Sequence, residues 1–195
     1  MTETIIAIIM SFIGTNIDDI FINTLFFAQA DTKHKINSVI IGKYLGIGTL
    51  VLVSCLGAFF LHSVPQKYIG FLGLVPIALG IKEWISYLKS KNQSSSDDFE
   101  EKQDMSGGMV LNVALVTMSN GADNIGVYMP LFAGYTVFQM IAVVIVFSVM
   151  IALWCILGKK LSDLPGLRDF LLKYKYIIVP VVFVILGIYI VLKSM

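Results

Sequence analysis

The sequence has few charged residues for its length. Only 14% of its 195 residues are charged, whereas 57% are hydrophobic. Soluble domains contain about 25% charged residues, so this composition excludes an ordinary soluble domain and indicates an integral membrane protein. There is no basic stripe of the kind that binds nucleic acid. There is also no glycine-rich phosphate loop ending in Lys-Ser or Lys-Thr, which excludes direct use of ATP through such a motif.

Cysteine is also scarce. Cys55 and Cys155 are the two cysteines, and both lie within apolar runs. Their spacing fits neither a zinc finger nor a disulfide framework. We interpret both as small buried side chains, because free cysteine is among the most buried residue types. The alternative is a soft metal ligand that lines a transport path.

Long apolar stretches recur along the whole chain. A helix needs about 20 apolar residues to cross the hydrocarbon core. Six stretches qualify, at residues 4–28, 37–62, 68–88, 109–132, 136–157 and 176–193. The one hydrophilic segment, 89–108, lies between the third and fourth stretches, and its acidic composition predicts a solvated linker. The fold class is therefore predicted to be an all-α integral membrane protein with six transmembrane helices.

The basic residues predict the orientation of these spans. All but two of the 14 Lys and Arg residues, Lys67 and Lys193, fall on one side of the predicted membrane. Because cytoplasmic loops carry an excess of Lys and Arg, we expect both termini to be extracellular and the linker to be cytoplasmic. Lys43, at the cytoplasmic start of the second span, is expected to extend its ammonium group to the interface. A role as counter-ion of an acidic site is the alternative.

The two halves of the chain resemble each other. Asp18-Asp19-Ile20 aligns with Asp123-Asn124-Ile125, and each string lies in the first span of its half. Three spans per half make the second half enter the membrane in the opposite sense. Such inverted repeats place a substrate site near the midplane, between the halves. We therefore expect a three-helix repeat at 1–88, a linker at 89–108 and a second three-helix repeat at 109–195.

Three carboxylates lie at mid-depth in the predicted spans, at Asp18, Asp19 and Asp123. A charged Asp costs roughly 2.5–3.5 kcal/mol at the bilayer centre. With no basic residue near either motif, we expect these groups to meet each other, a cation or a proton. Amide and hydroxyl oxygens accompany them, and together they form the oxygen-rich ligand set of a divalent cation. The amides are Asn16, Asn120 and Asn124; the accessory candidates are Thr15, Asn23, Thr117 and Ser119. Hydrogen bonding between helices is the alternative role of Asn23, Thr117 and Ser119.

The neighbouring positions of Asp18 and Asp19 leave two backbone conformations open, an unwound helix and a regular one. On a regular helix the two side chains point about 100° apart, so both face one ion only if the helix unwinds. Gly14 and Asn120-Gly121 are the places where such a break is easiest. Unwound backbone is tolerated at this depth where it lines a cavity, and its carbonyls then become ligands. In a regular helix, one aspartate would bind the ion and the other would support it or carry a proton.

The strings Gly14-Thr15-Asn16-Ile17-Asp18-Asp19-Ile20 and Ser119-Asn120-Gly121-Ala122-Asp123-Asn124-Ile125 resemble those of bacterial cadmium-resistance transporters of the CadD type, within the lysine-exporter superfamily. The similarity spans nearly the whole chain. It implies a transporter rather than an enzyme, which exports divalent metal as a multi-pass protein of the bacterial cytoplasmic membrane. It implies a metal site at Asn16, Asp18, Asp19, Asn120, Asp123 and Asn124.

Cadmium as the cargo rests on this resemblance. Oxygen ligands alone favour harder ions, so manganese and zinc stay open as cargo. We expect no resident cofactor. Clustered carboxylates cannot all remain ionised once the metal leaves, so we expect an antiporter that exchanges metal for protons. Export of a small basic amino acid is the alternative. The expected partners are the metal and membrane lipid, without nucleic acid, and the oligomeric state stays open, a homo-oligomer included.

Overall fold

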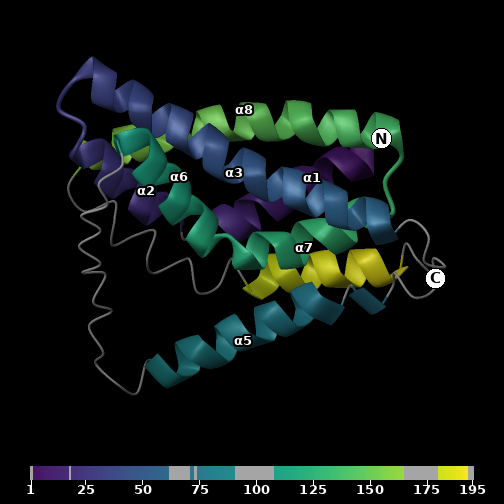
Figure 1. Ribbon diagram of the computed structural model, residues 1–195. Coiled ribbons are helices and arrows are strands. Elements are labelled where there is room, and N and C mark those ends of the chain that lie inside the picture. Colours follow the sequence, from purple (N-terminus) through teal and green to yellow (C-terminus); the bar gives the residue numbers. More distant parts are fainter. Residues whose placement is uncertain are drawn as a thin grey trace.

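The computed structural model describes residues 2–17, 19–61, 71–72, 74–90, 108–164 and 180–192. Every element in these ranges is a helix, and the helices form one bundle (Figure 1). Asp18 and residues 91–107 of the predicted linker lie outside the described residues. The helices are α1 (Thr2–Asn16), α2 (Asp19–Ala28), α3 (Lys33–Leu61), α5 (Leu74–Ser90), α6 (Met109–Asn120), α7 (Ala122–Ala133), α8 (Val137–Ser162) and a last helix, Pro180–Leu192.

Two of these helices are long and apolar enough to cross a membrane. They are α3, with 29 residues, and α8, with 26. At 1.5 Å per residue, each is roughly 40 Å long and exceeds the hydrocarbon core of about 30 Å. The bent pair α1–α2 is a third span if it is counted as one, while α6 and the last helix are shorter apolar helices. The all-helical expectation is confirmed for the described residues, and six spans remain a prediction.

Both sequence motifs coincide with breaks in helices. α1 ends at Asn16 and α2 begins at Asp19, with 65° between their directions. α6 ends at Asn120 and α7 begins at Ala122, so Gly121 lies at the second break. The Gly121 backbone has an ordinary φ of −92°. Its lack of a side chain matters instead, because a Cβ there would lie 2.1 Å from Leu50 of α3. Of the two backbone conformations that the sequence left open, the structure has the broken one at both motifs. The first break falls just after Asn16 rather than at Gly14.

The long helix of each half packs against the broken helix of the other half. α3 contacts α6 and α7, while α8 contacts α1 and α2 (Figure 1). The α3–α6 contact is close, because a Cβ at Gly42 would lie 2.6 Å from the Cβ of Val113. Each half thus supplies a broken helix followed by a long one. The three-helix repeat and its inverted orientation both remain predictions.

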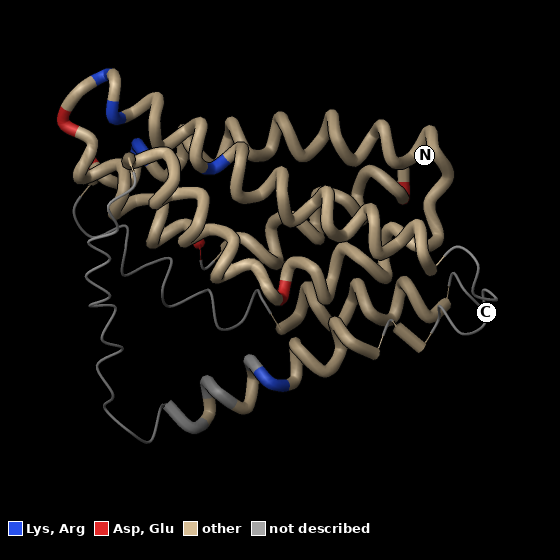
Figure 2. The backbone as a smooth tube through the Cα atoms, in the orientation of Figure 1, with Lys and Arg blue, Asp and Glu red and all other residues tan. Residues whose placement is uncertain are grey.

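The two ends of the bundle differ in charge. α1 and α8 begin at the same end, where Gln139 Nε2 donates to Thr4 Oγ1 at 3.0 Å. At the opposite end, Figure 2 shows basic residues around the connection between α2 and α3. α8 also finishes with Lys159 and Lys160 in its last turn. Separation of this kind agrees with the predicted cytoplasmic side, although the orientation itself stays a prediction.

Candidate metal site at the helix breaks

Each break places a carboxylate at the start of a half-helix. Asp19 is the first residue of α2, and Asp123 is in the first turn of α7. The free N–H groups at a helix N-terminus carry positive partial charge, which stabilises a carboxylate there. Asn16 and Asn120 end the preceding half-helices, whose last carbonyls carry negative partial charge. Both breaks therefore combine acidic side chains with carbonyl oxygens able to coordinate a cation.

Tyr128 joins the first motif to the helix that begins at the second. Its hydroxyl is 2.6 Å from Thr15 Oγ1 and accepts a hydrogen bond from Asn16 Nδ2 at 2.9 Å. Asn16 Nδ2 also donates to Thr15 Oγ1 at 2.9 Å. All three side chains are buried. Because hydrogen bonds in a low-dielectric interior reinforce one another, this group fixes the end of α1 against α7.

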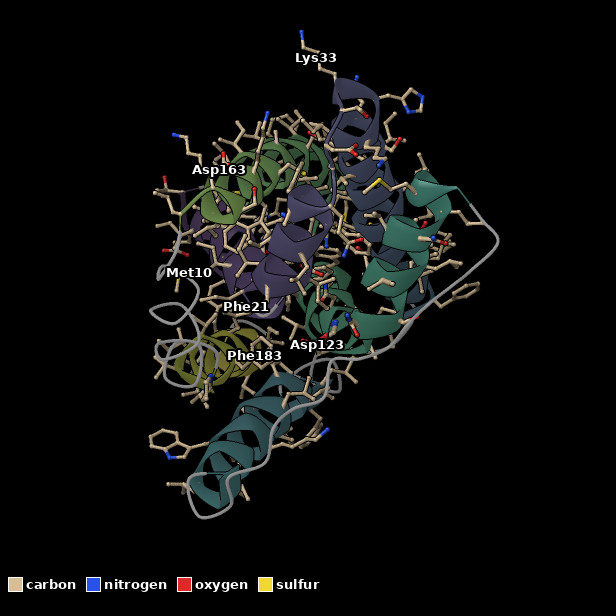
Figure 3. The ribbon with its side chains drawn as sticks, turned by 90° about the vertical axis from the view of Figure 1, so that its left-hand side faces the viewer. Met10, Phe21, Lys33, Asp123, Asp163 and Phe183 are labelled. Atoms are coloured by element: carbon tan, nitrogen blue, oxygen red, sulfur yellow. The ribbon has the colours of Figure 1, made fainter. Side chains whose placement is uncertain are left out.

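Asn124 makes the second connection between the motifs. Its amide nitrogen lies 3.2 Å from the backbone carbonyl of Thr15 and 3.2 Å from Asp123 Oδ1, in the orientation that turns the nitrogen toward these two acceptors. Asn124 is buried, and Asp123 is partly buried. The two motifs are about a hundred residues apart in sequence, and the fold brings them into contact. Figure 3 views the bundle from the end of the α2–α3 connection, with Asp123 in the interior and Lys33 projecting outward.

Asp19 forms an ion pair with Lys43, in which Lys43 Nζ donates to Asp19 Oδ2. Lys43 is 1% exposed and lies ten residues into α3, about 15 Å from the start of the helix. The prediction that Lys43 extends to the interface is therefore wrong, and so is the expectation that no basic residue lies near the motifs. The flexible stem of a lysine reaches far less than 15 Å, and the close approach of α6 at Gly42 encloses this part of α3. The alternative role, a counter-ion, describes what is observed.

α8 holds the first break from the other side. Trp154 Nε1 donates to the carbonyl of Asn16 at 2.9 Å, which gives a partner to a backbone group freed by the end of α1. Asn23 Nδ2 of α2 in turn donates to the carbonyl of Trp154 at 3.0 Å. α1 and α2 are thus fixed to the same point of α8. Backbone groups freed within a membrane helix need such partners.

Sequence reasoning missed Tyr128 and Trp154. Tyr128 follows Asn124 by four residues and so shares its helix face, which is a signal that the sequence carries. Trp154 has no comparable signal, because α8 is apolar on all sides and its sequence does not show which side packs against the first motif.

The remaining candidate residues, on α6, take no part in the hydrogen bonds that join the two motifs. Asn120 is exposed, and exposed Ser119 donates to the carbonyl of Leu115 in its own helix. Thr117 is 3% exposed, and its Oγ1 has no hydrogen-bond partner among the described residues. Gly46 of α3 packs against it, since a Cβ there would lie 2.7 Å from Thr117 Cβ. Thr117 therefore belongs to the α3–α6 interface.

Among the described residues, no group of three or more His, Cys, Asp and Glu side chains is placed to hold a metal. Asp18 is outside this search. A metal site at the breaks therefore needs amide, hydroxyl or backbone oxygens beside Asp19 and Asp123. Such oxygens are present at Thr15, Asn16 and Asn124. This mixed oxygen set suits a hard or borderline divalent ion.

Apolar helices of spanning length, packed against helices that break at buried polar motifs, are typical of helical membrane transporters. Comparison with known families gives the particular class: residues 12–195 match the model of the cadmium resistance transporter family. Because this match covers most of the chain, the protein belongs to that family, and the resemblance seen in its motifs is confirmed. No curated protein and no solved structure matches the chain.

Proposed function

We propose that the protein is a secondary transporter that exports a divalent metal ion, cadmium first, across a bacterial cytoplasmic membrane. The observation that carries this proposal is the contact between the two motifs, in which the amide of Asn124 lies 3.2 Å from the carbonyl of Thr15. Two helix breaks that meet inside a bundle supply carbonyl and carboxylate oxygens from both halves of the chain. In inverted-repeat transporters, such breaks form the substrate site.

The charges of the motifs match one divalent ion. Asp18, Asp19 and Asp123 have a formal charge of −3, and the ammonium of Lys43 within the same site brings the sum to −2. The remaining charge of −2 is balanced by one M²⁺ ion. When the ion leaves, two negative charges at this depth are costly, so protons take its place. Export of metal in exchange for protons follows from this balance, with the two halves rocking to open the site to either side.

The identity of the metal follows from the family rather than from the ligands. Oxygen ligands are compatible with manganese and zinc as well as cadmium. Export of a small basic amino acid is the second candidate, and one observation favours it: a primary ammonium, that of Lys43, already fits beside Asp19. These candidates differ in the cargo and share the same carboxylates.

The test is transport into inside-out membrane vesicles, in which an exporter accumulates its cargo. We expect cadmium to accumulate when a proton gradient is imposed, and radiolabelled lysine to stay outside. Asp123→Asn removes one carboxylate at the second break, so cadmium accumulation should fall to background. Asp163→Asn is the matched control, because Asp163 is exposed at the end of α8, and this variant should transport normally.

Three results would contradict the proposal. Accumulation of lysine without cadmium would favour the second candidate. Wild-type transport by Asp123→Asn would remove the site assignment. Cadmium accumulation that does not respond to a proton gradient of either sign would remove the exchange mechanism and leave the site in place.

A further inference from the structure

The buried ion pair between Lys43 and Asp19 is the least expected feature of the molecule. Its two side chains are 2% and 8% exposed, whereas the other described ion pair of α3, Lys35 with Asp31, has side chains 46% and 68% exposed. Lysine is rarely buried to this degree in a protein. Within a membrane span, such a residue is a functional candidate by default.

Stability alone explains this pair poorly. Removing two charges from water costs several kcal/mol per ion, and their attraction often only offsets that cost, so hydrophobic residues of similar volume usually serve as well. The packing of α3 around Lys43 does not depend on a charge, because Gly42 and Gly46 allow α6 to approach α3 closely there. Another role for the ammonium is therefore worth seeking.

The position of Asp19 suggests this role. Asp19 begins α2 directly after the break, whose other side is held by Thr15 and Asn16. The ammonium of Lys43 therefore occupies the charged face of the site where a metal cation would bind. An ammonium is a compact point charge on a flexible four-carbon stem, so it can leave the carboxylate and return without movement of the backbone.

We propose that Lys43 is a tethered competitor of the transported metal. Its ammonium neutralises Asp19 while the site is empty, and an arriving divalent ion displaces it. Competition from the ammonium lowers the affinity for metal, which allows release on the far side. Once the metal has left, Lys43 pairs with Asp19 again and resets the site. This inference rests on the proposed function, because it requires a divalent cation that binds at Asp19.

The experiment is calorimetric titration of the purified full chain in lipid nanodiscs with cadmium chloride. Lys43→Met removes the competitor, so cadmium should bind at least tenfold more tightly, a gain of about 1.4 kcal/mol. Export at saturating cadmium should slow, because release becomes harder. Lys43→Arg should have the opposite effect, because a guanidinium holds a carboxylate with two parallel hydrogen bonds. Cadmium should then bind at least about threefold more weakly than it binds the wild-type protein.

Lys35→Met is the matched control. It removes a lysine from an exposed ion pair at the start of the same helix, and it should leave the affinity unchanged. Because Lys43→Arg keeps the charge, it tests the proposal even if Lys43→Met does not fold. Opposite shifts in affinity from two variants of one residue cannot arise from a purely structural ion pair.

The outcomes separate this inference from the proposed function. If wild-type protein binds cadmium but both Lys43 variants bind it equally well, or both bind it more weakly, Lys43 is a structural residue and the inference is wrong. If wild-type protein binds neither cadmium, zinc nor manganese, the proposed function fails, and the inference fails with it.

Discussion

Replacing Tyr128 by Phe tests whether the contact between the two motifs holds the site. The change removes one hydroxyl and keeps the ring, which packs against Phe147 and Phe132 with centroid distances of 5.0 and 5.7 Å. Two hydrogen bonds are lost, one with Thr15 and one with Asn16. At about 0.5–1.5 kcal/mol each, the expected loss of stability is about 1–3 kcal/mol.

Thermal unfolding in detergent and cadmium titration together measure this effect. For a chain of this size, 1 kcal/mol corresponds to roughly 2–4 °C, so the melting temperature should fall by about 2–12 °C. Cadmium should also bind at least about tenfold more weakly, a loss near 1.4 kcal/mol, because the end of α1 is no longer fixed against α7.

The matched control is Tyr44→Phe. The Tyr44 hydroxyl donates to the carbonyl of Ser148 at 2.7 Å, so this bond also joins two helices, but it lies on the exposed surface. Its loss should cost about 1 kcal/mol and leave cadmium binding unchanged. Wild-type cadmium affinity in Tyr128→Phe, or an equal loss in both variants, would refute the reasoning.

Two further predictions concern packing and metal choice. Gly42→Ala should destabilise the protein by about 1–3 kcal/mol, because its Cβ would lie 2.6 Å from Val113 Cβ and 2.7 Å from a backbone oxygen of α6. Gly48→Ala, with open space around it on the same helix, should be neutral or stabilising by up to about 1 kcal/mol, and thermal unfolding compares the two. Cys155→Ala should keep cadmium transport at the wild-type rate, because Cys155 is a packed core residue, 4% exposed. Loss of cadmium transport with manganese transport intact would instead identify Cys155 as a soft ligand.

Much of the fold follows from patterns that the sequence carries openly. The apolar runs at 37–62 and 136–157 became α3 and α8 with ends shifted by a few residues. The adjacent aspartates of the first motif offered a broken helix as one alternative, because they cannot both face one ion on a regular helix. Asn120-Gly121 was identified as an easy place for a break, and the second break lies there. The sequence pattern could not predict which helices pack together. In the structure, the long helix of each half packs against the broken helix of the other half.

The site was harder to predict than the fold, and Lys43 shows why. Residue type and distance from a span end suggested a side chain that reaches the interface. The deciding fact was tertiary packing, in which α6 lies against α3 and α2 brings Asp19 within reach of Lys43. Tertiary packing of this kind leaves no local signal in the sequence. The motif residues Thr15, Asn16 and Asn124 were predicted as candidates and lie together; their role as metal ligands remains a proposal.

The central claim is that the two broken helices hold one divalent ion between them. Anomalous X-ray scattering from a crystal of the full chain grown with cadmium tests it most directly. We predict one strong peak between the start of α2 and the start of α7, with oxygen ligands from both motifs at about 2.3–2.6 Å, the range seen for calcium, an ion of similar size. A peak at the acidic segment 97–104, or one coordinated by a single motif, would contradict the account.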